Sequence, residues 1–333
     1  MKPVKEITIT RTFDAPRQLV FEAWLDEKHL QQWWMPRGFT NPTCRITSSS
    51  RPGYAETGAE LTVVTYHPAF GDMPQTGKFE EVSPFDKIIF STAAFLNSEG
   101  KPQLRGRNVI VFTDEPATNE SNNKARTRMV ITASILEAGP GHEGALAGMD
   151  QGWAETLDRL NEHVEDTSDR EMSITRVVDA PRDLVWKIWT EPDHIKDWWG
   201  PNGFKNTIHK YDLVPGGEWV LTMHGPDGTD YPNHIRFVEI IPQQRLIYDH
   251  GRPPAIHGSA DSGASMPYDQ PEDGGSFRTF VHFIEEGDKT RVSMRGVFKT
   301  VEYRQMVIEK YGALEGQNQH IARMEAYLTK LHK

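Results

Sequence analysis

Apolar and polar positions follow two different rhythms in the first half of the chain. Residues 7–13 alternate apolar and polar side chains, which predicts a strand. Residues 149–165 place apolar side chains at helical spacing, which predicts an amphipathic helix. Two short helices should follow the first strand, and Asp14-Ala15-Pro16 should open the first of them with the aspartate as its N-cap. Further alternating segments predict strands at 60–66, 78–82, 88–94, 107–113 and 126–136.

The second half repeats this order of elements. A last helix is expected over 313–331, after strands at 218–224, 234–241, 245–249, 276–285 and 290–298. Each half therefore has segregated helices and strands, which is typical of the α+β class. We predict a curved antiparallel sheet wrapped on one long C-terminal helix in each half.

An internal repeat runs through the whole chain. Residues 11–24 read RTFDAPRQLVFEAW, and residues 176–189, at an offset of 165, read RVVDAPRDLVWKIW. The same offset relates WWMPRGFTN, which starts at Trp33, to WWGPNGFKN, which starts at Trp198. Offsets of 158 and 164 relate the later strands and the last helices. Such a long period indicates duplication of a whole domain, at 1–166 and 171–333, with a short polar linker between the copies.

Composition and charge narrow the classes of partner. The chain is 37% hydrophobic and 25% charged, which is typical of a globular protein, and its formal net charge is −10. Because it also lacks a run of Lys and Arg, nucleic acid and anionic membranes are not expected as partners. Cys44 is the single cysteine, so no intrachain disulfide can form. Together with the absence of a signal-like or membrane-spanning apolar run, this predicts a cytoplasmic protein.

The motifs resemble a known family. They are D-A-P-x-x-L-V-[FW]-x-x-W, then W-W-x-P-x-G-F, then G-G-E-W with G-P-D-G, then P-x-x-R-L-[IV]. This set is similar to the AHSA-type domain, named for the activator of heat shock protein 90 ATPase, in the START/SRPBCC helix-grip superfamily. The resemblance covers nearly all of both halves. It implies a hydrophobic cavity between the sheet and the long helix, and members include ligand carriers, polyketide cyclases, drug-sequestering proteins and chaperone regulators.

Three functions remain open on this basis. The first is binding of a small hydrophobic ligand, and the second is a cyclase- or hydrolase-like activity with His250 or His282 as a pocket general base. The third is regulation of a chaperone, which would make a chaperone the partner. No nucleophile motif or metal-ligand spacing occurs, so we assign no catalytic residue, metal or cofactor.

The candidate ligand-binding residues are mostly aromatic. We expect one indole of each Trp-Trp pair in the core and the other at the cavity mouth. Trp153 and Gln317 are equivalent on the last helices, so Trp153 should partly plug the first copy. The second copy should then hold the larger, more polar cavity and be the principal site, with loop 251–275 as its lid. The full set is Trp33, Trp34, Phe39, Trp153, Trp198, Trp199, Phe204, Met223, Tyr248, His250, His282 and Gln317.

Overall fold

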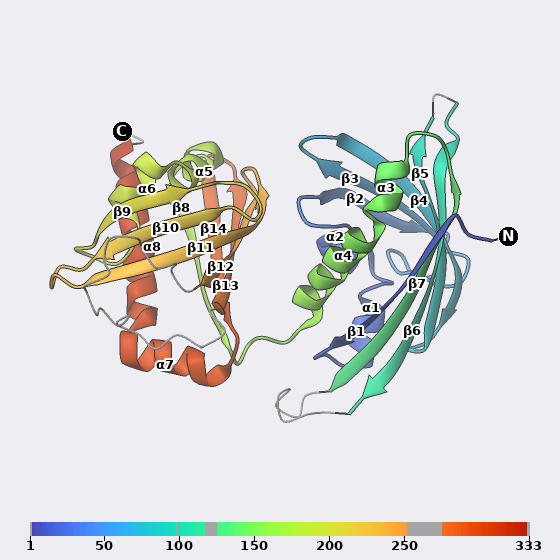
Figure 1. Cartoon of the computed structure of the whole chain (residues 1–333), viewed down its shortest axis with the longest axis horizontal. Coiled ribbons are helices and arrows are strands. Elements are labelled where there is room, and N and C mark those ends of the chain that lie inside the picture. Colours follow the sequence, from blue (N-terminus) through green and yellow to red (C-terminus); the bar gives the residue numbers. More distant parts are fainter. Residues whose placement is uncertain (1, 98, 117–124, 252–274, 332–333) are drawn as a thin grey trace. The chain divides into compact units, whose positions relative to one another are not determined.

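The computed structural model describes residues 2–97, 99–116, 125–251 and 275–331. Contacts divide the chain into two compact units, Met1–Asp166 and Thr167–Lys333. Each unit contains one seven-stranded antiparallel sheet with its own helices, including one long helix near the end of the unit (Figure 1). The predicted duplication of one α+β helix-grip domain is confirmed.

The first sheet has the strand order β1-β7-β6-β5-β4-β3-β2. Its strands are β1 (Lys5–Phe13), β2 (Thr40–Thr47), β3 (Glu60–His67), β4 (Gly71–Ser83), β5 (Lys87–Leu96), β6 (Pro102–Glu115) and β7 (Arg126–Ala138). The helices of this unit are α1 (Arg17–Glu22), α2 (Glu27–Trp33), α3 (Glu143–Ala147) and α4 (Met149–Val164).

The second sheet repeats that order as β8-β14-β13-β12-β11-β10-β9. Its strands are β8 (Glu171–Val178), β9 (Lys205–Tyr211), β10 (Glu218–His224), β11 (Asp230–Ile241), β12 (Arg245–Gly251), β13 (Gly275–Glu286) and β14 (Lys289–Phe298). The helices are α5 (Arg182–Thr190), α6 (Pro192–Trp198), α7 (Val301–Tyr311) and α8 (Ala313–Leu331). Helix α8 has the predicted bounds. Helix α7 was not predicted, and it buries no residue, so its sequence carries no strong apolar stripe.

Each core lies between the long helix and the inner face of its own sheet. In the first unit Leu157 and Leu160 of α4 join Ile110 and Phe112 of β6 in one buried cluster. Fully burying such a side chain stabilises the fold by about 1.5–3 kcal/mol relative to exposure. The stripe at helical spacing and the strand alternation therefore account for the helix lying on this face. The second unit repeats the arrangement with α8.

The residues of the D-A-P run make tertiary hydrogen bonds in place of the predicted helix cap. Asp14 does not cap α1, whose N-cap position is Pro16 without a side-chain hydrogen bond. Its carboxylate instead accepts a hydrogen bond from Arg126 Nε at 2.9 Å. The Thr127 hydroxyl donates to the Ala15 carbonyl at 2.7 Å, and the equivalent contact recurs in the second unit at 2.8 Å. A tertiary partner on β7 therefore replaces the expected local cap.

Candidate functional site

The first tryptophan of each pair is a core residue. Trp33 and Trp198 are both fully buried. Trp33 Nε1 donates to the Ala23 carbonyl at 3.0 Å, and Trp198 Nε1 donates to the Ile188 carbonyl at 3.0 Å. Because the donors are satisfied by backbone oxygens, these two indoles are held inside the fold.

The second tryptophan of the first copy borders a cavity of about 330 Å³. Its walls come from the loop after Trp34, from the inner faces of β4 to β7, and from α3 and α4. Trp153 also lines this cavity and does not fill it. Its ring stacks on Trp24 with centroids 6.4 Å apart, which holds the indole against one wall. The first copy therefore has a cavity beside Trp153, and the expected partial plugging by this indole stays a prediction.

Four neutral polar side chains interrupt the apolar wall: Gln75, Thr92, Asn108 and Thr156. The Thr156 hydroxyl donates to the Gly152 carbonyl at 2.7 Å, one turn earlier in α4. Asn108 is only 4% exposed, yet within the described residues its carboxamide makes no hydrogen bond. Sequence reasoning did not single out any of the four.

The cavity contains no acid–base chemistry of its own. Seventeen residues line it, and none carries an Asp, Glu, His, Lys, Arg, Cys or Tyr side chain. General acid–base catalysis needs a titratable group within hydrogen-bond reach of the reacting atom. The lining side chains can therefore bind and orient a molecule, but they cannot transfer its protons.

A buried arginine fixes the loop that forms one wall. Arg159 of α4 is 6% exposed. Its guanidinium donates to the carbonyl oxygens of Met35 and Pro36, each at 3.1 Å, as well as to Gln32 at 2.8 Å and Phe39 at 3.2 Å. Four carbonyls converging on one cation hold Met35 and Pro36 at the cavity.

The second copy has an equivalent arginine that donates to backbone carbonyls. Arg323, at the equivalent position of α8, donates to one carbonyl of α6 and to four carbonyls of the loop that follows it. We call residues 34–39 and 199–204 the Trp-Trp loops of the two copies. The acceptors are Asp197, Trp199, Gly200, Pro201 and Phe204. The match at offset 164 could have revealed both arginines. A single arginine on a helix, read alone, indicates only a solvated face.

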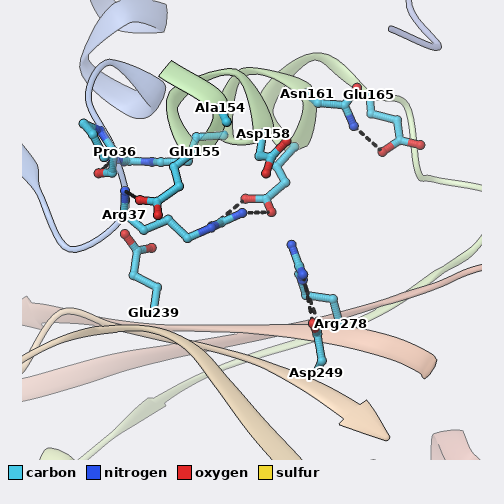
Figure 2. Close-up of polar contacts among 12 residues, drawn as sticks. Pro36, Arg37, Ala154, Glu155, Asp158, Asn161, Glu165, Glu239, Asp249 and Arg278 are labelled. Atoms are coloured by element: carbon cyan, nitrogen blue, oxygen red, sulfur yellow. Dashed lines mark hydrogen bonds and ion pairs between the residues drawn. The ribbon is translucent and has the colours of Figure 1, made fainter. Parts of the chain in front are cut away.

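Two further contacts hold the first loop. Asn41 Nδ2 donates to the carbonyls of Trp34 at 2.7 Å and Gln31 at 3.2 Å. The equivalent asparagine of the second copy does the same for its own loop. Figure 2 shows Arg37 beside helix α4, where its backbone N–H donates to Glu155 at 3.3 Å.

An aromatic column occupies the equivalent region of the second copy. Strand register places Phe277 opposite His250, where the first copy has Gly106 opposite Thr92. The His250 ring stacks on Phe277 at 3.9 Å, and Phe277 stacks in turn on Phe298 at 4.8 Å. Large rings thus stand where the first copy has small side chains.

His250 is part of this column and is bonded within it. Its Nε2 lies 3.2 Å from Thr279 Oγ1, on the neighbouring strand. Burial lowers the pKa of His250 to about 3, with the charge of Asp249 opposing the shift. The imidazole is therefore neutral near pH 7 and a weak base.

His282 lies on the face of its sheet that is turned away from the core, which gives no support to its expected role as a pocket general base. It alternates on β13 with Val281 and Phe283, which both point into the core, so its own side chain lies on the opposite face of the sheet. Burial, followed by the charges of Arg245 and Arg295, lowers the pKa of His282 to about 4.

The other predicted aromatic residues, Phe39, Phe204 and Trp199, make ring contacts at three separate places. The ring centroids of Phe39 and His67 are 4.7 Å apart, and Phe39 does not line the cavity. Phe204 lies 5.5 Å from Tyr231. Trp199 packs against Trp219 and His320 in a second-copy aromatic cluster, with centroids 4.6 and 4.5 Å apart.

The remaining predicted positions are distributed over the second unit. Tyr248 is buried in the core cluster, and Met223 is half-buried beside Gly200. Gln317 is half-buried on α8. The predicted lid, 251–275, falls almost wholly outside the described residues, so a larger second-copy cavity stays a prediction.

The curved sheet, the long helix and the cavity between them define a helix-grip protein. A family model, described as Activator of Hsp90 ATPase homolog 1-like protein, matches residues 14–165 and 179–329. The chain therefore belongs to this family and carries two tandem copies of its domain. No curated protein matches the chain. In the part of the chain that the structure describes, no helix is long and apolar enough to cross a membrane.

Several solved structures are similar to the chain. A protein from Arthrobacter aurescens is 26% identical over 50% of this chain and 90% of its own, with a TM-score of 0.42. Protein NE0264 from Nitrosomonas europaea is 24% identical over 50% of this chain and 97% of its own, with a TM-score of 0.39. The di-domain ARO/CYC StfQ from the steffimycin biosynthetic pathway is 13% identical over 98% of this chain and 99% of its own, with a TM-score of 0.44.

Proposed function

We propose that this chain is a ligand-binding protein whose first copy encloses a small hydrophobic molecule. The observation that carries the proposal is the cavity of about 330 Å³ between α4 and the first sheet. Ligand cavities in proteins usually measure about 300–1,000 Å³ and combine apolar walls with a few polar groups. This cavity has that size and that composition.

The walls favour a ligand with aromatic or polarisable surface. Trp34 and Trp153 both line the cavity, with ring centroids 6.2 Å apart and nearly perpendicular planes. Met35 and Met149 add two thioethers. Indoles and thioethers both make favourable contacts with aromatic rings. A flat ring that enters this space would contact both kinds of side chain.

The general-base alternative finds less support. The first cavity has no ionisable lining residue, and the pKa of His250 is lowered to about 3 by burial. A general base is most effective when its pKa is near the working pH. Binding without proton transfer therefore agrees better with both copies.

We assign the principal site to the first copy, although the sequence favoured the second. The small residues Thr92 and Gly106 leave space that His250 and Phe277 occupy in the second unit. The second copy was favoured because of Gln317, the longer loop 251–275 and its histidines, and a substitution at Gln317 distinguishes the two copies. A Gln317→Trp change should leave ligand affinity of the full chain unchanged if the first copy is the principal site, and weaken it if the second copy is.

Dye binding to the full chain tests the proposal. We expect saturable fluorescence enhancement of N-phenyl-1-naphthylamine, an uncharged apolar dye. Ala94→Phe, which points a ring into the cavity, should weaken binding at least tenfold, or about 1.4 kcal/mol. Ala93→Phe is the matched control, because the neighbouring side chain lies on the opposite face of β5.

Two results would contradict the proposal. One is an absence of saturable binding by the unmodified chain. The other is equal weakening by the Ala94 and Ala93 variants at unchanged thermal stability. Native mass spectrometry of the freshly purified chain adds a direct measurement, because a co-purified molecule would appear as a mass increment.

A further inference from the structure

Asn108 carries an unused carboxamide in the cavity wall. It projects inward from β6, between Phe90 on one neighbouring strand and Ala133 on the other. It is 4% exposed and lines the cavity, yet its amide group makes no hydrogen bond within the described residues. The amide is open to the cavity and is not among the sealed polar atoms of the core, so a molecule in the cavity can supply the partner that the described part of the chain does not.

Two comparable positions differ from Asn108 in the partners of their donor groups. Thr279, at the equivalent position of the second copy, lies 3.2 Å from His250 Nε2 and is thus already partnered. Asn41 is as buried as Asn108, but its amide donates to two backbone carbonyls. The Asn41 Nδ2 and the Thr279 hydroxyl therefore have partners within the fold. Asn41 Oδ1 has none among the described residues, but Asn41 does not line the cavity, whereas Asn108 does.

The cavity also offers no charge to a ligand. None of its lining residues is ionisable, and the cations that bond to residues of α4 are paired with its carboxylates. Arg159 is directed at loop carbonyls, Lys5 is paired with Asp150, and Arg11 is paired with Asp158. A charged group buried without a counter-charge is much more costly than a neutral polar group. The site therefore discriminates against ions.

We propose that this cavity selects an uncharged aromatic molecule whose carbonyl, amide or hydroxyl group hydrogen-bonds to the carboxamide of Asn108. At protein-like packing density, a cavity of this volume holds about 240 Å³ of ligand, roughly two or three fused rings with a substituent. The carboxamide both donates and accepts, so it suits each of these neutral groups. This inference rests on the proposed function and names the ligand class of the same site.

Naphthalene and three derivatives that differ in one substituent test the inference by calorimetric titration of the full chain at pH 7. They are naphthalene, naphthalene-2-carboxamide, 2-naphthoate and 2-naphthylmethylammonium. We expect the carboxamide to bind at least tenfold more tightly than the anion or the cation. Asn108→Leu should weaken carboxamide binding about fivefold to twentyfold and leave naphthalene binding unchanged or tighter. The control Thr279→Val, in the second copy, should change none of the four affinities.

The outcomes separate this inference from the proposed function. If no probe binds and the apolar dye also fails, the proposed function is wrong. If the dye binds but the naphthoate binds as tightly as the carboxamide, the selection against charge is overturned and the ligand-binding function stands. If Asn108→Leu weakens naphthalene and the carboxamide equally, Asn108 shapes the cavity without recognising a polar group, and its assigned role is overturned.

Discussion

Asn108 and Asn41 form a matched pair for which the structure predicts stability changes of opposite sign. Both are asparagines of the first unit, and they are 4% and 5% exposed. The amide of Asn41 donates to the carbonyls of Trp34 and Gln31, whereas the amide of Asn108 makes no hydrogen bond in the described part of the chain. Replacing each by leucine therefore removes two hydrogen bonds in one case and none in the other.

The magnitudes follow from those contacts. A net hydrogen bond is worth about 1 kcal/mol, and each buried acceptor left unpaired costs about 1–3 kcal/mol. Asn41→Leu leaves two such acceptors and should thus lower the free energy of unfolding by about 2–6 kcal/mol. Asn108→Leu removes the cost of holding an unpaired amide in an apolar wall and keeps a similar volume. We expect it to raise the free energy of unfolding by about 1 kcal/mol.

Scanning calorimetry of the full chain measures both changes. For a unit of this size, 1 kcal/mol corresponds to about 2–4 °C in Tm. The transition of the first unit should rise by a few degrees in the Asn108 variant and fall markedly in the Asn41 variant, while the transition of the second unit stays in place. A loss of about 2 kcal/mol or more in the Asn108 variant would refute the reasoning, because it would mean that the amide is satisfied in the free protein.

Three further predictions concern the arginines that hold the Trp-Trp loops, the dependence of stability on pH, and the independent folding of the two units. Arg159→Met should accelerate amide hydrogen exchange in the Trp-Trp loop of the first copy alone, and Arg323→Met in that of the second copy alone; changes in both loops would contradict the local role of each arginine. His320 is 8% exposed, and burial, followed by the charge of Arg323, lowers its pKa to about 3. The unfolded state, with a histidine pKa of about 6.5, then binds more protons, so stability is full above pH 6.5 and falls as the pH drops, by about 2 kcal/mol at pH 5. Urea unfolding at pH 7.5 and 5 should show that His320→Gln reduces the loss of stability between these pH values by about 2 kcal/mol, while the buried His250 and His282 account for a loss that remains. An unchanged loss would exclude His320 as a source. Residues 1–166 and 167–333, expressed separately, should each unfold cooperatively, because each has its own core and sheet; a half without a transition would show that the units depend on each other.

The sequence by itself was sufficient for the repeat, the fold class and most elements. Helix α8 was predicted to the residue, because its apolar stripe has a helical period that can be read locally. Part of the site was also predicted, since Trp34 and Trp153 were named and both line the cavity. These inferences succeed because periodicity and large aromatic side chains report on burial without reference to distant residues.

Tertiary structure alone decided which groups are paired and which space is empty. Asp14 stands in a sequence pattern typical of a helix cap, but its partner in the structure is Arg126, which is distant in sequence. Trp153 was expected to narrow the first cavity, and its position there depends on stacking against Trp24. The ring column of His250 and Phe277 and the unpaired amide of Asn108 both follow from cross-strand register. Register joins residues far apart in the chain, so a local pattern specifies that a side chain points inward but not what it meets there.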